Sequence, residues 1–149
     1  REMNEEERRV RNAGSIIVVV ATDAPLLPDQ CDALARRVTL GLARTGTAGS
    51  HFSGDLFVAF SVGNPGAFSR GAETLFGQGY GSYDELRFLP WGHLDPFFEA
   101  VVQATEEAVL DSLVANEEMV GFRGHRSPAL PRDRVVELLG DRGTGARPD

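Results

Sequence analysis

The chain has 149 residues, of which 42% are hydrophobic and 25% charged, and it carries a formal net charge of −7. Its length suffices for a domain with its own hydrophobic core, and its composition is that of a soluble globular protein. The basic residues are scattered, whereas binding to nucleic acid requires a concentrated positive surface, so we exclude nucleic acid as the main partner. No stretch approaches the roughly 20 apolar residues of a membrane span, so we expect no membrane partner either, and we favour the cytoplasm as the compartment.

The first part of the chain changes character abruptly at Ser15. Residues 1–14 are charged and lack apolar periodicity, which predicts an exposed polar lead-in. Residues 15–22 (SIIVVVAT) are largely β-branched and apolar at both alternating sets of positions. This pattern predicts a strand buried on both faces, and hence a sheet that is covered on two sides.

A helix and a second strand follow. Residues 28–44 show the helical period, with Cys31, Leu34, Ala35, Val38 and Leu42 on the apolar face. Cys31 is the single cysteine, which excludes an intrachain disulfide and predicts a buried, inert thiol. Residues 54–62 predict the second strand. Residues 63–83 hold six glycines and predict a long irregular loop, which in compact domains is often functional.

The remainder of the chain reads as helical. We expect a long helix over 95–118 and a short one over 132–139. The core face of the long helix is marked by Phe98, Val101, Val102, Thr105, Val109 and Leu113. The sequence shows no internal repeat, so we expect one domain over 15–140, preceded by the polar segment 1–14 and followed by a frayed end at 141–149.

Cofactor and metal motifs are missing from the sequence. Gly77, Gly79 and Gly81 do not follow a strand or open a helix as a dinucleotide fingerprint does, and there is no phosphate-binding loop. The three histidines have no second ligand three or four positions away. We therefore expect neither a metal nor a cofactor. No Gly-x-Ser-x-Gly elbow supports a Ser-His-Asp triad.

The junction of Gly14 and Ser15 has chemical potential, although a serine that opens a strand is common. A serine hydroxyl can attack the carbonyl before it and form an ester, whose hydrolysis frees a new N-terminus. A preceding glycine tolerates the strained backbone that this requires. The freed α-amine has a reference pKa of about 7.7–8, so it can act as a base near neutral pH.

Ser53 and Asp55 open the second strand and are two residues apart, so in extended chain they point to the same face. A hydroxyl held by this carboxylate can orient or relay a proton for a neighbouring Ser15. The pattern alone favours the plainer interpretation, which is a turn leading into a strand.

A family resemblance changes this balance. The stretch ATDAPLLP at 21–28, just after the Gly-Ser junction, is its most specific signal. LARR at 34–37, GLARTG at 41–46, SGDLFVAFS at 53–61, NEEMVG at 116–121 and GHRSPALP at 124–131 continue it in order. With these motifs the chain resembles the DmpA-type, or β-peptidyl, aminopeptidases, which are self-processing serine aminopeptidases of peptidase family S58. The resemblance covers about residues 11–140.

The resemblance implies a mechanism and a fold. Members are made as one precursor that cuts itself before the serine matching Ser15, and the resulting α and β polypeptides stay together. They remove N-terminal residues from short peptides, amides or esters. The residue matching Ser15 attacks, and those matching Ser53 and Asp55 assist it; some members carry Glu at the last position. The implied fold is a four-layer α/β/β/α sandwich with mixed sheets covered by helices.

The resemblance also implies partners. This chain matches the nucleophile-bearing β part, so we expect an α polypeptide of the same precursor to supply oxyanion-stabilising groups and the pocket for the substrate's amine. We expect a homo-oligomer of αβ pairs, and without the α part we expect exposed apolar strand faces. Two alternatives stay open: a non-catalytic fragment or interaction domain, and an acyltransferase like the ornithine acetyltransferases, which use threonine where this chain has Ser15.

Overall fold

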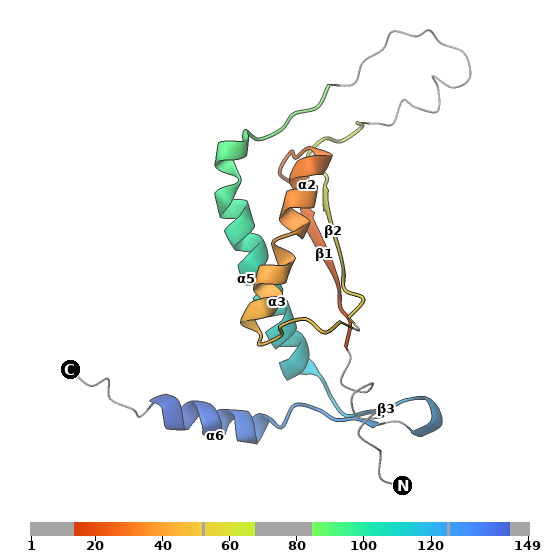
Figure 1. The fold of residues 1–149 in the computed structure, drawn as a ribbon, viewed down its shortest axis with the longest axis vertical. Coiled ribbons are helices and arrows are strands. Elements are labelled where there is room, and N and C mark those ends of the chain that lie inside the picture. Colours follow the sequence, from red (N-terminus) through yellow and green to blue (C-terminus); the bar gives the residue numbers. More distant parts are fainter. Residues whose placement is uncertain (1–13, 52, 68–84, 125, 144–149) are drawn as a thin grey trace, which may run out of the picture. The chain divides into compact units, whose positions relative to one another are not determined.

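The computed structural model describes residues 14–51, 53–67, 85–124 and 126–143 (Figure 1). In chain order its elements are β1 (Ile17–Thr22), α2 (Pro28–Ala35), α3 (Val38–Arg44), β2 (Leu56–Ser61), the 3₁₀ helix η1 (Trp91–His93), α5 (Asp95–Ala115), β3 (Met119–Val120), the 3₁₀ helix η2 (Phe122–Gly124), β4 (Arg126–Ser127) and α6 (Arg132–Gly143). The fold is of the predicted α/β class. The expected loop at 63–83 falls largely on residues outside the described ranges. The chain divides into two compact units, residues 1–106 and 107–149, and the division lies within α5.

Strands β1 and β2 pair in parallel, in a register that runs from Ile17 beside Leu56 to Thr22 beside Ser61. Helix α2 packs on this pair of strands. Along both strands, half-buried side chains alternate with exposed ones, and Ile17 is 72% exposed. The prediction that the first strand is buried on both faces is therefore wrong for this chain by itself, because no described element covers the second face. That bare apolar face is what we expected of the chain without its α part. It consists of Ile17, Val19, Leu56, Val58 and Phe60.

The core lies between α2, α3 and the first half of α5. Its buried apolar residues include the predicted Cys31, Leu34, Ala35, Val38, Leu42, Val101 and Val102, together with Leu26 and Leu94. Gln30 is also fully buried, and both ends of its amide are bonded: its Oε1 accepts the Leu27 N–H, and its Nε2 donates to the Leu89 carbonyl at 2.7 Å. Gln30 thus fixes the start of α2 to the segment that leads into η1 without leaving a buried polar group unpaired.

The predicted single helix over 28–44 is wrong, because the chain turns at residues 36–37 and divides it into α2 and α3. The N–H of Arg37 bonds to the Leu34 carbonyl, three residues back, instead of continuing the helical pattern. The Thr39 hydroxyl donates to the Arg36 carbonyl at 2.9 Å. Hydroxyl groups that bond to nearby backbone compete with the helix in this way, and apolar spacing does not reveal it.

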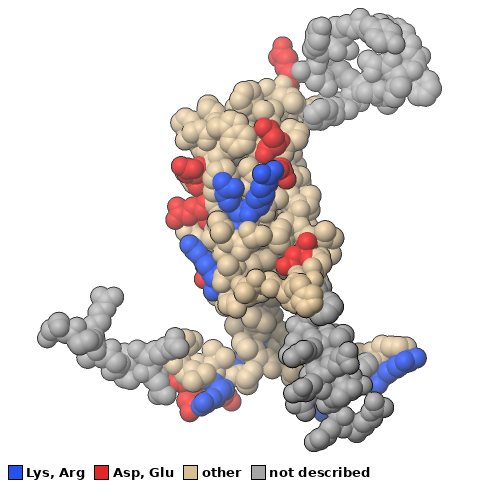
Figure 2. Space-filling model, viewed as in Figure 1, with Lys and Arg blue, Asp and Glu red and all other residues tan. Residues whose placement is uncertain are grey.

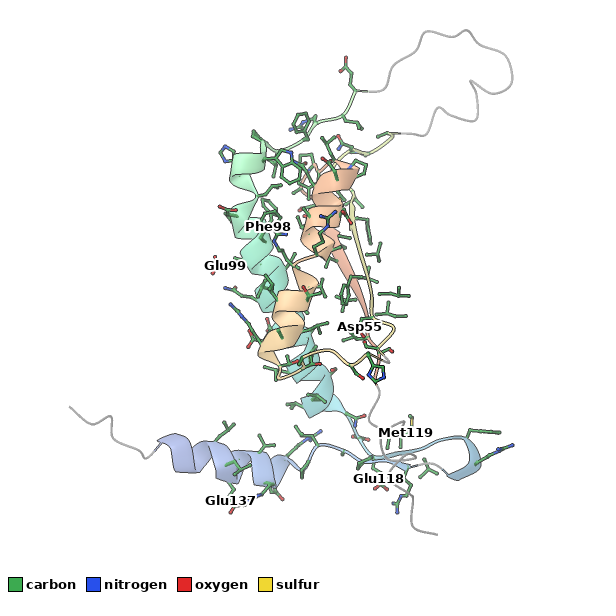
Figure 3. All side chains as sticks on the ribbon, in the orientation of Figure 1. Asp55, Phe98, Glu99, Glu118, Met119 and Glu137 are labelled. Atoms are coloured by element: carbon green, nitrogen blue, oxygen red, sulfur yellow. The ribbon has the colours of Figure 1, made fainter. Side chains whose placement is uncertain are left out.

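Helices α3 and α5 approach closely at Gly41. A Cβ built on Gly41 would lie 2.6 Å from both the Thr105 Cβ and the Val102 carbonyl oxygen. The Arg37 guanidinium stacks 4.0 Å from the centre of the Phe98 ring, which Figure 3 labels on α5. Only a residue without a side chain fits at position 41, so this glycine sets the distance between the two helices.

The second unit has little core of its own. Among its described residues up to 140, no side chain is buried, and Leu113 is 47% exposed, so its predicted place on a core face is wrong. Helix α5 ends at Ala115 rather than at the predicted residue 118. Acidic side chains at the C-terminal end of a helix oppose its dipole. Glu118 instead forms an ion pair with Arg126 across the β3–β4 hairpin, which the sequence did not predict. Helix α6 runs to Gly143, past the expected fraying at 141.

The surface of the described residues bears on two classes of partner, membranes and nucleic acids. None of their helices is both long and apolar enough to cross a membrane. On the face shown in Figure 2, basic side chains are interspersed with acidic ones and do not merge into one positive surface.

We predict that Gly41→Ala destabilises the protein by about 1–3 kcal/mol, because the added methyl group overpacks the contact with α5. The free energy of unfolding in denaturant measures this. Gly92→Ala is the matched control in the same unit: a Cβ there meets nothing within 4 Å, so we expect a change of at most about 0.5 kcal/mol. Equal stability of the two variants would contradict the close approach.

Candidate active site

The candidate site lies at the edge of the sheet where β1 and β2 both begin. Ser15 stands two residues before β1, and Ser53, Gly54 and Asp55 stand directly before β2. Parallel strands start at the same edge, so the shared register brings these two segments of the chain together. Figure 3 shows Asp55 at this end of the two strands.

Two hydrogen bonds join the two segments just before the first strand pair, which is Ile17 and Leu56. The Ile16 N–H donates to Asp55 Oδ1 at 3.0 Å, and the Gly54 N–H donates to Ser15 Oγ at 2.9 Å. Each joins residues 39 positions apart, the spacing of the strand register itself. Side chains thus take over from the backbone ladder where the strands begin, and they hold the Ser15 hydroxyl against the second segment.

Ser53 and Asp55 are joined as their spacing predicts. The Ser53 hydroxyl bonds to the Asp55 carboxylate and lowers the pKa of Asp55, and the Ile16 N–H lowers it further. Both bonds favour the charged form of the carboxyl group. Asp55 is fully exposed in the described chain, so it is an ionised acceptor at neutral pH that holds one hydroxyl and one backbone amide.

The arrangement therefore unites the predicted residues. Ser15 and Asp55 are exposed and Ser53 is half-buried, so the hydroxyl groups and the carboxylate are open to a reactant. Such a group can support acyl transfer, in which a hydroxyl attacks a carbonyl carbon while neighbouring polar groups orient it. The catalytic roles of Ser15, Ser53 and Asp55, and cleavage between Gly14 and Ser15, stay predictions at this point.

Other candidate chemistry is not supported. Burial raises the pKa of the Cys31 thiol, and the charge of Asp29 raises it further, so Cys31 is a poor nucleophile. Within the described ranges, no three His, Cys, Asp or Glu side chains are grouped so that they could hold a metal ion. His125 lies outside those ranges.

Sequence reasoning missed the two backbone donors, the N–H groups of Ile16 and Gly54. Residue types do not reveal a backbone donor. The signal was the pairing of two predicted strands that each begin just after a serine, combined with the rule that parallel strands start at one edge.

Comparison with known proteins gives a consistent result. The sequence model of "Peptidase family S58" matches residues 1–127. The chain is 43% identical over 126 residues to "Beta-peptidyl aminopeptidase BapA" of Sphingosinicella microcystinivorans, a match that covers 85% of this chain and 30% of that protein. The chain thus spans less than a third of the length of this curated relative.

Solved structures agree. A β-aminopeptidase of Burkholderia sp. superposes with a TM-score of 0.71 at 36% identity, covering 95% of this chain and 39% of that one. The L-aminopeptidase D-Ala-esterase/amidase of Ochrobactrum anthropi superposes with a TM-score of 0.73 at 32% identity, with the same coverages. The latter is described as a prototype for the serine aminopeptidases and a variant of the Ntn hydrolase fold.

We predict that the Asp55 carboxyl group titrates below its ordinary pKa of about 3.9, and that Ser53→Ala moves the pKa upward because the largest stabilising bond is lost. Carbon-13 NMR of the carboxyl group measures both values. A lowered pKa in the folded state contributes stability above about pH 3.9, and that contribution is lost as the pH falls through the folded-state value.

Ser112→Ala is the control, because its hydroxyl donates to the Val109 carbonyl within α5 and should leave the Asp55 titration unchanged. An Asp55 pKa that does not respond to Ser53→Ala would remove the Ser53 hydroxyl from this site.

Proposed function

The chain belongs to peptidase family S58, and from this membership we propose that it is the nucleophile-bearing part of a serine aminopeptidase. The proposed reaction is hydrolysis of N-terminal residues from short peptides, amides or esters. The observation that carries the proposal is the grouping of Ser15, Ser53 and Asp55 at one edge of the sheet, in a chain whose relatives include proteins named as aminopeptidases.

Self-cleavage between Gly14 and Ser15 comes first in this proposal. Ser15 Oγ attacks the Gly14 carbonyl carbon and forms a C–O bond, the Gly14–Ser15 C–N bond breaks, and the hydroxyl proton passes to the Ser15 nitrogen. Water then hydrolyses the ester, which leaves a carboxylate on Gly14 and a free α-amine on Ser15. Gly14 and Ser15 are both exposed, so the junction is open to water in the described chain.

Turnover repeats this chemistry on a substrate. Ser15 Oγ attacks the substrate carbonyl, the α-amine of Ser15 accepts the hydroxyl proton, and that proton passes to the departing amine. Water hydrolyses the resulting acyl ester. We assign Asp55 and Ser53 the task of orienting the nucleophile, because one oxygen of Asp55 holds the Ile16 amide next to Ser15 while its carboxylate also binds Ser53.

We also propose that an α polypeptide from the same precursor completes the enzyme. The chain spans about 30% of the curated relative's length, and no described element covers the apolar face of β1 and β2. Parallel strands are normally covered on both faces. A second sheet laid on this face would give the four-layer α/β/β/α sandwich, and αβ pairs would then assemble into an oligomer.

Self-cleavage is tested by intact mass and N-terminal sequencing of the full natural gene product after purification. We expect a polypeptide that begins Ser15-Ile16-Ile17. A single uncut chain would overturn Ser15 as the self-processing nucleophile and would favour the alternative of a non-catalytic interaction domain.

Ser15→Ala is expected to abolish both self-cleavage and hydrolysis, whereas Ser15→Thr or Ser15→Cys keeps a nucleophile and should retain partial self-cleavage. Gel analysis of cleavage and release of a chromogenic amide measure the two activities. Ser112→Ala, which removes a hydroxyl bonded within α5, should behave as the unmodified protein. Hydrolysis that survives Ser15→Ala would contradict the proposal.

Asp55→Asn is expected to slow hydrolysis by about 10- to 100-fold with the fold intact, because an exposed carboxylate that orients the nucleophile becomes a neutral amide. Steady-state kinetics on the assembled, cleaved enzyme measure this, with circular dichroism to check the fold. Unchanged turnover would remove Asp55 from the mechanism.

A further inference from the structure

The backbone N–H of Gly54 is hydrogen-bonded to the oxygen of the proposed nucleophile. It lies 2.9 Å from Ser15 Oγ and donates to it. Gly54 carries no side chain, and a Cβ built there would lie 3.6 Å from the same oxygen. The donor is therefore a main-chain group just before the start of β2, so its position depends on the strand register and not on a side-chain rotamer.

The ladder between the strands shows that this bond is a departure from the regular pattern. The Leu56 N–H donates to the Ile16 carbonyl and the Val62 N–H to the Thr22 carbonyl, each to a residue 40 positions earlier (56 to 16, 62 to 22). The same step from Gly54 leads to the carbonyl of Gly14. In place of that carbonyl, the Gly54 N–H binds Ser15 Oγ.

This diversion has a consequence for the carbonyl of the proposed cleavage junction. A ladder bond to the Gly14 oxygen would hold the peptide flat in a continuing strand. Without that bond, the Gly14 carbonyl lies outside the ladder while the attacking oxygen is fixed against β2. One backbone donor thereby ends the strand pairing at the residue where the chain is proposed to be cut.

We propose that the Gly54 N–H is a catalytic group that stabilises negative charge on Ser15 Oγ, both in self-cleavage and in substrate hydrolysis; this rests on the function proposed above. As the hydroxyl proton leaves, Oγ gains negative charge and the bond becomes charge-assisted, which makes it roughly twice as strong. Once Oγ has become an ester oxygen, the bond weakens. The Gly54 N–H therefore favours the transition state over the bound substrate and acts on the rate rather than on binding.

Replacing the Gly54 amide by an ester tests this without changing any side chain. Glycolic acid is incorporated at position 54 of the full natural gene product by nonsense suppression, so an oxygen replaces the N–H. We expect self-cleavage and kcat per active site to fall together by about 10- to 100-fold, with KM unchanged. Gly54→Ala keeps the donor and is expected to slow self-cleavage less than the ester does.

The matched control places an ester at Val62, whose N–H donates to the Thr22 carbonyl at 2.9 Å at the opposite end of the strands. It loses one interstrand bond without touching Ser15. Three results would overturn the inference while leaving the proposed function standing. The two esters could lose rate equally, the Gly54 ester could raise KM without lowering kcat, or the Gly54 ester could match the unmodified protein. An unmodified protein that neither cuts itself nor hydrolyses substrate would overturn both.

Discussion

The parallel register of β1 and β2 is the constraint on which the rest of the site depends. Ile17 lies beside Leu56, and the same offset carried backwards sets Ile16 beside Asp55 and Ser15 beside Gly54. Because side chains alternate along a strand, a slip of one residue would turn the exposed apolar face toward α2 and separate the Ser15 hydroxyl from the Gly54 N–H. The contacts that define the sheet therefore also define the site.

The helices secure that register from one side. Helix α2 packs on both strands, and Gly41 of α3 lets the α5 backbone come within contact of the α3 backbone. Gly63, just after β2, is similarly tight, because a Cβ there would lie 2.4 Å from the Pro25 nitrogen. The close approach at Gly63 therefore lies at the ends of the strands opposite the site, whereas the one at Gly41 joins α3 to α5.

The sequence predicted much of this unit, and its failures have physical causes. Apolar spacing located both strands and most of the core, because burial selects residue types directly. It did not locate the break at residues 36–37 or the end of α5 at Ala115, because hydroxyl–backbone bonds and helix-end charges decide those. Of the site, the spacing of Ser53 and Asp55 predicted their shared face correctly, whereas the donor at Gly54 had no residue-type signal.

The bare strand face connects these observations with the chemistry. The prediction of burial on both faces failed for the described residues, and the proposed α polypeptide would account for the apolar pattern by covering the exposed face. The exposed Ile17 and Leu56 directly follow Ile16 and Asp55, which are hydrogen-bonded to each other at the candidate site. A proposed cover that extended from these residues to Ser15 would exclude water from beside its hydroxyl. On the proposed mechanism, removing water would strengthen the interaction of the Gly54 N–H with the negative charge that develops on Ser15 Oγ, since such a bond acts weakly in a high dielectric. On the proposed function, assembly and catalytic strength would thus be coupled through the two strands.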